Sequence, residues 1–316
     1  MSISQPIVFE PLPMERVWGG RRLESLYGKA LPHGAPIGES WEVVDREDAQ
    51  SVVHTGPLRG TTLHELWTSH REAVFGKPYI DHPAPRFPML IKLLDARDRL
   101  SVQVHPPAAI APSLGGEPKT EMWYFADTQP GASIYAGLKK GVTRDLFEKL
   151  LHQGRVEEAL HVVPVENGQS IFIPSGRLHA IGEGNVIVEV QQNSDTTYRV
   201  FDWNRTGLDG QPRKLHLDES MVSTDFADFE PDVCRKEEGV LAECPYFVVK
   251  KIRLEAPEPA TKHGRFGIYT VLTGSVSCAG ETFKPGDFFL VPASLEGATV
   301  EPTSPQTTLL RSTLPL

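Results

Sequence analysis

The sequence predicts a folded protein dominated by β-strands that form a sandwich or a barrel. Its apolar segments are short and bounded by turn residues, and its 27 glycines and 27 prolines are spread through the chain. Both features are typical of many short strands joined by tight turns. The chain has 316 residues, of which 40% are hydrophobic and 23% charged, so it is long enough for one or two domains with a substantial core.

Nine segments have the length and the boundaries of strands. Each is short and apolar or alternating, and Gly, Pro, Asp or Asn residues mark its ends. They are residues 40–44, 88–94, 101–104, 121–126, 170–174, 186–191, 246–254, 269–277 and 287–291.

Two helical segments interrupt these strands. The first begins at a capping box formed by Thr62 and Glu65 and ends at Gly76. The second, over residues 143 to about 161, has apolar side chains at helical spacing and a break at Gly154. We interpret this second segment as a helical insertion in the first domain.

An acidic, polar stretch divides the chain and predicts a domain boundary. We place a first domain over residues 1–225, a linker over 226–240 and a small β domain over 241–316. The last segment contains strand–turn–strand patterns that are similar to half of a small jelly-roll barrel, but no histidine cluster. We therefore expect any metal site and the catalytic residues to lie in the first domain.

Charge and cysteine content exclude several function classes. The formal net charge of −9 disfavours binding to nucleic acids and to anionic membranes. No apolar stretch has the roughly 20 residues of a transmembrane helix, and residues 1–6 lack the features of a signal peptide, which favours a cytoplasmic location. The three cysteines show no Cys-x-x-Cys spacing, so we expect reduced thiols rather than disulfides.

Three segments carry candidate metal ligands. Gln103 and His105 are two residues apart in a predicted strand and would therefore project from the same face, although such a pair is often incidental. Glu121 opens an aromatic strand two residues after Lys119, where a metal ligand and a surface salt bridge are both possible.

The third segment is the most specific. Residues 168–179 read Gly-x5-Pro-x-Gly-x2-His, which resembles the second motif of the cupins, whose histidine, here His179, is a metal ligand. Glu183 replaces the final asparagine of that motif, and Asn185 follows two residues later. This motif specifies the predicted fold class as a double-stranded β-helix, the cupin jelly-roll. Two histidines and one glutamate are a common ligand set for catalytic zinc, and iron and manganese accept it as well.

Several motifs together resemble the class I mannose-6-phosphate isomerases, in their short bacterial form. They lie at residues 37–43, 87–95, 101–106, 119–124 and 192–199. The resemblance implies one Zn²⁺ per chain, an active-site arginine and a sugar-phosphate substrate. By similarity, the zinc ligands are His105, Glu121, His179 and Gln103, and the active-site arginine is Arg199.

The implied reaction moves a proton between carbons 1 and 2 of the sugar through an enediol. A metal and a guanidinium can both stabilise the charge that develops on the two oxygens. We expect Glu189 to be the general base, with Asp195 as second candidate or a substrate-binding group. The alternative for either carboxylate is a salt bridge to Arg199 without a role in proton transfer. Lys92 and Lys119 are our candidates for binding the phosphorylated substrate.

Two other functions fit the same motifs. One is a non-catalytic protein that binds a sugar phosphate, because a fold does not determine activity. The other is a metal-dependent cupin enzyme with a different substrate, such as an iron oxygenase. We expect a small-molecule substrate, no nucleic-acid or membrane partner, and a monomer or weak homodimer.

Overall fold

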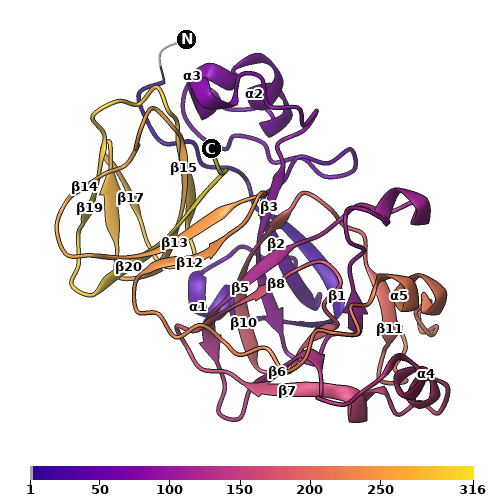
Figure 1. Ribbon diagram of the computed structural model, residues 1–316. Helices are drawn as coiled ribbons and strands as arrows, with labels where there is room; N and C mark the ends of the chain where they lie inside the picture. Colours follow the sequence, from indigo (N-terminus) through magenta and orange to yellow (C-terminus); the bar gives the residue numbers. More distant parts are fainter. Residues whose placement is uncertain (1–2) are drawn as a thin grey trace.

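The computed structural model describes residues 3–316, and its first part consists of two antiparallel sheets packed face to face (Figure 1). The six-stranded sheet has the order β1 (Leu12–Gly20), β2 (Ile37–Val43), β3 (Met89–Ala96), β10 (Asn185–Gln192), β5 (Glu121–Thr128), β8 (Ser170–Ile173). The five-stranded sheet has the order β11 (Tyr198–Phe201), β4 (Val102–Val104), β9 (His179–Ile181), β6 (Ser133–Leu138), β7 (Leu160–Pro164).

Apolar side chains from both sheets meet between them. Trp123 and Ile187 of the larger sheet share one buried cluster with Ile134 and Ile181 of the smaller sheet. A jelly-roll leaves one end of such a space available for a ligand, because the strands alternate inward and outward side chains. The predicted cupin fold is confirmed.

The C-terminal part repeats this two-sheet plan on a smaller scale. Its larger sheet has the order β12 (Gly239–Glu243), β13 (Val248–Leu254), β20 (Thr307–Thr313), β15 (Gly267–Thr273), β18 (Phe288–Val291), and its smaller sheet the order β14 (Glu258–Pro259), β19 (Thr299–Pro302), β16 (Val276–Cys278), β17 (Glu281–Phe283). The single strand predicted over 269–277 is wrong. The chain turns at Gly274, whose φ of 70° favours glycine, and so divides the segment into β15 and β16.

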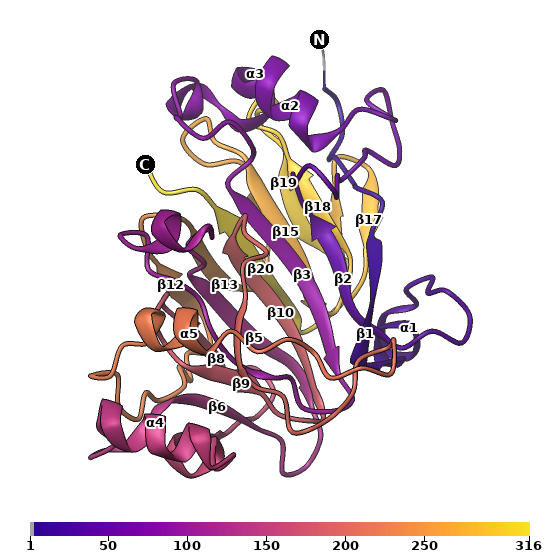
Figure 2. The same cartoon turned by 90° about the vertical axis from the view of Figure 1, so that its right-hand side faces the viewer.

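The helices are short and lie outside the sheets (Figure 2). They are α1 (Arg22–Tyr27), α2 (Leu63–Ser69), α3 (Arg71–Phe75), α4 (Arg144–His152) and α5 (Leu217–Ser223), with 3₁₀ turns at Lys77–Tyr79, Ala111–Leu114 and Val156–Ala159. The capping box of Thr62 and Glu65 is confirmed at the start of α2. No helix within residues 3–316 combines the length and the apolar character that crossing a membrane requires.

The predicted helical insertion over 143–161 is too long. Helix α4 ends at His152, and after Gly154, with a φ of 68°, a single 3₁₀ turn leads into β7 at Leu160. Residues 156–161 have helix-forming side chains, but the last two of them belong to β7, which pairs with β6 at the edge of the sheet. Tertiary context has overridden local propensity here.

One apolar core crosses from the first sheet pair to the second. Phe75 of α3 packs edge-on against Phe266 at 5.2 Å between ring centroids and stacks on Phe87, and all three side chains are fully buried. An isolated bridge between Ile7 and Leu290 joins the N-terminal segment to the edge of the C-terminal sheet. Each sheet pair also encloses a cluster of its own, and on this ground we propose two units with an extensive shared interface.

The segment expected as a linker, 226–240, lies along the first sheet pair. Phe229 forms a bridge with Leu138, and Cys234 forms one with Ser170 at the edge of β8. Asp228 accepts two hydrogen bonds from the guanidinium of Arg177, both of 2.7 Å. This segment therefore covers a sheet edge in addition to joining the two units.

Candidate active site

Two histidines and a glutamate converge at the end of the first sheet pair. Glu121 begins β5, His179 begins β9, and His105 directly follows β4. His179 Nε2 lies 3.3 Å from Glu121 Oε1, and His105 Nε2 lies 3.7 Å from Glu121 Oε2. All three residues are at most 1% exposed, and one ligand atom of each lies within 4.8 Å of the others.

Backbone carbonyls fix the orientation of both imidazoles. His105 Nδ1 donates to the carbonyl of Thr196 and His179 Nδ1 to that of Arg177, each at 2.8 Å. This leaves both Nε2 lone pairs directed toward Glu121. Burial lowers the pKa of both imidazoles, that of His105 strongly, so both are neutral ligands at pH 7.

The site contains buried polar atoms that no protein group satisfies. Both carboxylate oxygens of Glu121 and Nε2 of His105 lack a hydrogen-bond partner among the described residues. Burying a carboxylate whose two oxygens accept no hydrogen bond is costly, and a bound cation would remove that cost. The amide nitrogen of Gln103 lies 3.2 Å from His179 Nε2, and Gln103 pairs in register with His179 in the next strand. Rotating this amide by 180° places its oxygen, in place of its nitrogen, beside His179 Nε2. This donor set fits a metal ion.

A cavity of about 420 Å³ opens beside these ligands, between the two sheets. Five basic and three acidic side chains line it, so its wall is net positive although the whole chain is net negative. The charged lining residues are Arg16, Glu39, Lys92, Lys119, Glu189, Asp195, Arg199 and Arg213. The structure thus brings every predicted catalytic, substrate-binding and metal-binding residue to the cavity or to the ligand cluster beside it.

The larger sheet supplies a buried ion-pair network. Glu189 of β10 lies 3.1 Å from Lys92 of β3 and accepts a hydrogen bond of 3.1 Å from the indole of Trp123. Burial raises the pKa of Glu189, and Lys92 only partly opposes this. Burial alone would lower the pKa of Lys92, but Glu189 and Glu39 raise it. Lys92 is therefore a fixed cation beside a carboxylate whose proton affinity is increased.

Glu39 completes this network and was not among the predicted site residues. It accepts hydrogen bonds from Arg16 at 2.8 Å and from the indole of Trp41 at 2.7 Å. Burial opposes ionisation, yet Lys92 and Arg16 lower its pKa to about 2. Glu39 lies within the motif over 37–43, where alternation in a strand could have indicated it, since Trp41 is on the same face.

The smaller sheet supplies an arginine cluster. Arg199 of β11 is in register with Gln103, donates to the carbonyl of Lys214 at 2.9 Å, and has a buried Nε without a partner. Burial and the neighbouring Arg213 lower its pKa. Arg213 and Arg205 both bind the carboxylate of Asp202, and Arg205 also lies 3.5 Å from Asp98. With Arg199, three guanidiniums share two carboxylates, so this end of the cavity keeps excess positive charge.

No sequence pattern indicates a role for Arg213. It lies in a polar loop fourteen positions after Arg199, where it cannot be distinguished from a solvated surface charge. Three other arginines of the first sheet pair do not line the cavity: Arg97, Arg99 and Arg177. Trp18 does line it, whereas Trp41 is buried with its ring 5.4 Å from the ammonium of Lys92.

The fold and the His105–Glu121–His179 cluster define a cupin with a candidate metal site beside a polar, net positive cavity. The catalytic domain of type I phosphomannose isomerases matches residues 9–127. The chain is 36% identical to mannose-6-phosphate isomerase ManA of Bacillus subtilis, over 92% of this chain and 94% of that protein, and 32% identical to mannose-6-phosphate isomerase of Streptococcus mutans, over 93% and 94%. A crystal structure of mannose 6-phosphate isomerase from Bacillus subtilis superposes with a TM-score of 0.86 at 30% identity, and covers 98% of this chain and 100% of that one. The chain belongs to the mannose-6-phosphate isomerase family, as its motifs predicted.

Proposed function

We propose that this protein is a metal-dependent aldose–ketose isomerase that interconverts mannose 6-phosphate and fructose 6-phosphate. The observation that carries this proposal is the buried His105–Glu121–His179 cluster with unsatisfied ligand atoms beside a net positive cavity. Relatives at 32–36% identity are named mannose-6-phosphate isomerases. The free cysteines fit a reducing, cytoplasmic location.

We propose one Zn²⁺ per chain, held by His105, Glu121, His179 and the amide oxygen of Gln103. Two neutral imidazoles and a carboxylate are a common zinc set. A mannose 6-phosphate isomerase of the same fold, 17% identical with a TM-score of 0.75, has been solved with zinc and yttrium bound. When bound, zinc polarises the carbonyl and hydroxyl oxygens of the sugar.

Glu189 is the proposed base that moves the proton between carbons 1 and 2. It faces the cavity while its neighbours Val188 and Val190 are buried in the core on the other face of β10. Its raised pKa suits a group that must both accept and return a proton. Arg199, next to Gln103, provides a fixed positive charge toward the enediol oxygens.

Lys92, Lys119 and Asp195 are proposed to bind the substrate, but Arg213 has the clearest role toward the phosphate. Lys92 pairs with Glu189, and Lys119 Nζ lies 3.9 Å from Glu121, so carboxylates already compensate both lysines. Asp202 instead pairs with both Arg213 and Arg205, and Arg205 also lies 3.5 Å from Asp98. Among the described residues no carboxylate pairs with Arg199, so three guanidiniums share two carboxylates. A dianionic phosphate placed at Arg213 neutralises the remaining charge there and leaves Arg199 for the enediol oxygens.

Replacing Arg213 with alanine is therefore expected to raise KM for mannose 6-phosphate by about tenfold to a hundredfold, with a smaller fall in kcat. A hydrogen bond to a charged group contributes about 1.5–3 kcal/mol. Arg205→Ala is the matched control, because Arg205 binds the same Asp202 but does not line the cavity. Steady-state kinetics on both variants test this, and equal effects on KM would contradict the assignment.

The function itself is tested with protein stripped by a chelator and then restored with zinc. A coupled assay should show conversion of mannose 6-phosphate to fructose 6-phosphate only after zinc is added. Folded, zinc-loaded protein without turnover would overturn the proposal. Calorimetry with mannose 6-phosphate would then identify a non-catalytic binder.

A further inference from the structure

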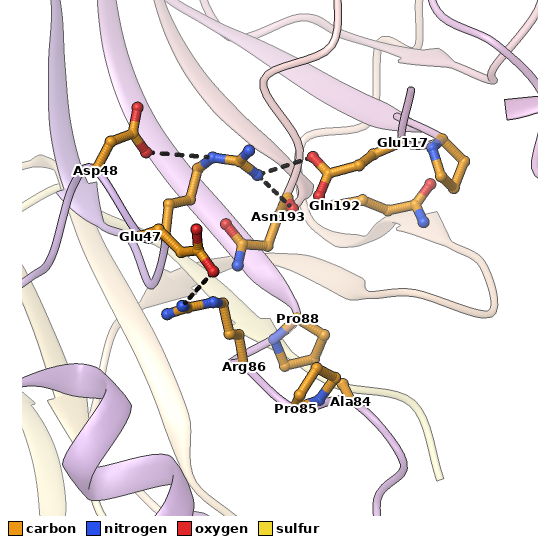
Figure 3. A pocket seen from close by; sticks show the side chains of 11 residues that line it. Glu47, Asp48, Ala84, Pro85, Arg86, Pro88, Glu117, Gln192 and Asn193 are labelled. Carbon is orange, nitrogen blue, oxygen red and sulfur yellow. Dashed lines mark hydrogen bonds and ion pairs between the residues drawn. The ribbon is translucent and has the colours of Figure 1, made fainter. Parts of the chain in front are cut away.

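A polar cleft lies on the outer side of the active-site loops (Figure 3). Its volume is about 890 Å³, and its walls come from the turn after β2, from residues 84–88, and from the segments that precede β5 and follow β10. Arg46 lies in the turn after β2 and lines this cleft, and its side chain is 20% exposed. The inner sides of the latter two segments line the catalytic cavity through Lys119 and Asp195.

Arg46 joins these two segments with a single nitrogen. Its Nη1 lies 2.9 Å from Oε2 of Glu117 and 3.0 Å from the carbonyl oxygen of Asn193, as Figure 3 shows. The same turn holds Asn193 from the other side, because the side-chain amide of Asn193 donates to the carbonyl of Asp45 at 2.6 Å. Arg46 therefore fixes the distance between the two segments from the side that faces away from the catalytic cavity.

The contacts continue from these segments to a metal ligand. The backbone N–H of Glu117 donates to Oγ1 of Thr196 at 2.9 Å, and the carbonyl of Thr196 accepts the 2.8 Å hydrogen bond from Nδ1 of His105. That carbonyl selects the tautomer and the orientation of the ring. A partner of this kind can change metal affinity tenfold to a hundredfold in other proteins.

We propose that Arg46 is a positioning residue that orients His105 through Thr196 and holds Lys119 and Asp195 in the cavity. An exposed ion pair would contribute little to stability or function. Arg46 differs because it is mostly buried and bridges two chain segments that both continue into the site. The metal-binding part of this inference is independent of the reaction, whereas its kinetic part rests on the proposed isomerase function.

The test compares Arg46→Ala with Arg86→Ala. Arg86 lies in the same cleft and pairs with Asp45 at 3.1 Å and Glu47 at 3.4 Å. Within residues 3–316 it forms no hydrogen bond or ion pair with either active-site segment. Cobalt(II) and zinc affinities are measured on metal-free protein by competition with a chromophoric chelator, together with kcat, KM and the unfolding midpoint of the metal-free protein. We expect Arg46→Ala to weaken metal affinity about tenfold and to lower kcat more than it raises KM. Arg86→Ala should change neither the metal affinity nor kcat, even if it lowers the unfolding midpoint as much as Arg46→Ala does.

A conservative variant separates positioning from general stability. Lysine at position 46 keeps one donor, so Arg46→Lys should recover part of the metal affinity and of kcat. If Arg46→Ala does not fold, Arg46→Lys and Glu117→Gln carry the same comparison with Arg86→Ala. If Arg46→Ala has the same metal affinity and the same kcat as Arg86→Ala, the positioning role is overturned. Weakened metal binding in a protein that never turns over mannose 6-phosphate would overturn the proposed function and leave the positioning role intact.

Discussion

Replacing His179 with alanine is expected to abolish metal binding and, with it, isomerase turnover. His179 supplies one of only two imidazoles of the ligand cluster, and its Nε2 is 3.3 Å from Glu121. Alanine leaves Glu121 and His105 without the third donor of a zinc site. We expect kcat to fall by about a thousandfold or more, corresponding to roughly 4 kcal/mol of lost transition-state stabilisation.

The measurements are metal content after dialysis and turnover in the coupled assay. His161→Ala provides the matched control, because this histidine lies on β7, outside the cavity and the ligand cluster. It should retain one metal ion per chain and wild-type turnover. A His179→Ala protein that keeps both would exclude the proposed metal site.

Local patterns predicted which side chains converge at Glu121, because each of these residues belongs to a strand or a tight turn. Alternation along β4 places Val102 and Val104 in a separate apolar cluster and leaves Gln103 facing the cavity. The glycine before His179, Gly176, has a φ of 94°, so the motif residue is needed for the turn itself. Asn185 donates to the carbonyl of Gly182 at 3.0 Å, two positions later than the motif places its asparagine.

The features that were missed depend on contacts between distant segments. Arg213 faces the cavity only because Asp202 holds it, and Arg46 acts through Glu117 and Asn193, far along the chain. The hydrophobic periodicity of one segment does not indicate which distant segment it will contact. The shared core around Phe266 was missed for a related reason, since an apolar helix face does not specify which sheet it will cover.

Strand β1 shows the same limit at the level of secondary structure. Its residues alternate poorly, with a Gly-Gly end, and its pairing with β2 contains two register shifts. A strand of this kind forms because a neighbour offers backbone partners, so its own sequence gives a weak signal.

Glutamine at position 189 is expected to remove turnover while leaving the metal in place. A correctly positioned base accelerates proton transfer about a hundredfold to ten-thousandfold, so kcat of Glu189→Gln should fall by that factor. The fold should tolerate the change, because Lys92 remains next to Glu39 and the amide can still accept from the indole of Trp123. Metal content should match that of the wild type.

Proton exchange identifies the base more directly than the rate does. In deuterated water, the wild-type enzyme should introduce deuterium from solvent at carbon 1 or 2 of the sugar phosphate, and Glu189→Gln should not. Asp195→Asn is the matched variant, because Asp195 also lines the cavity, where it raises the pKa of Lys92 less than Glu189 does. If Asp195 only binds the substrate, its variant should raise KM and still exchange the proton. Loss of exchange in Asp195→Asn with exchange retained in Glu189→Gln would reverse the two roles, and loss of metal from Glu189→Gln in parallel with turnover would make Glu189 a structural residue.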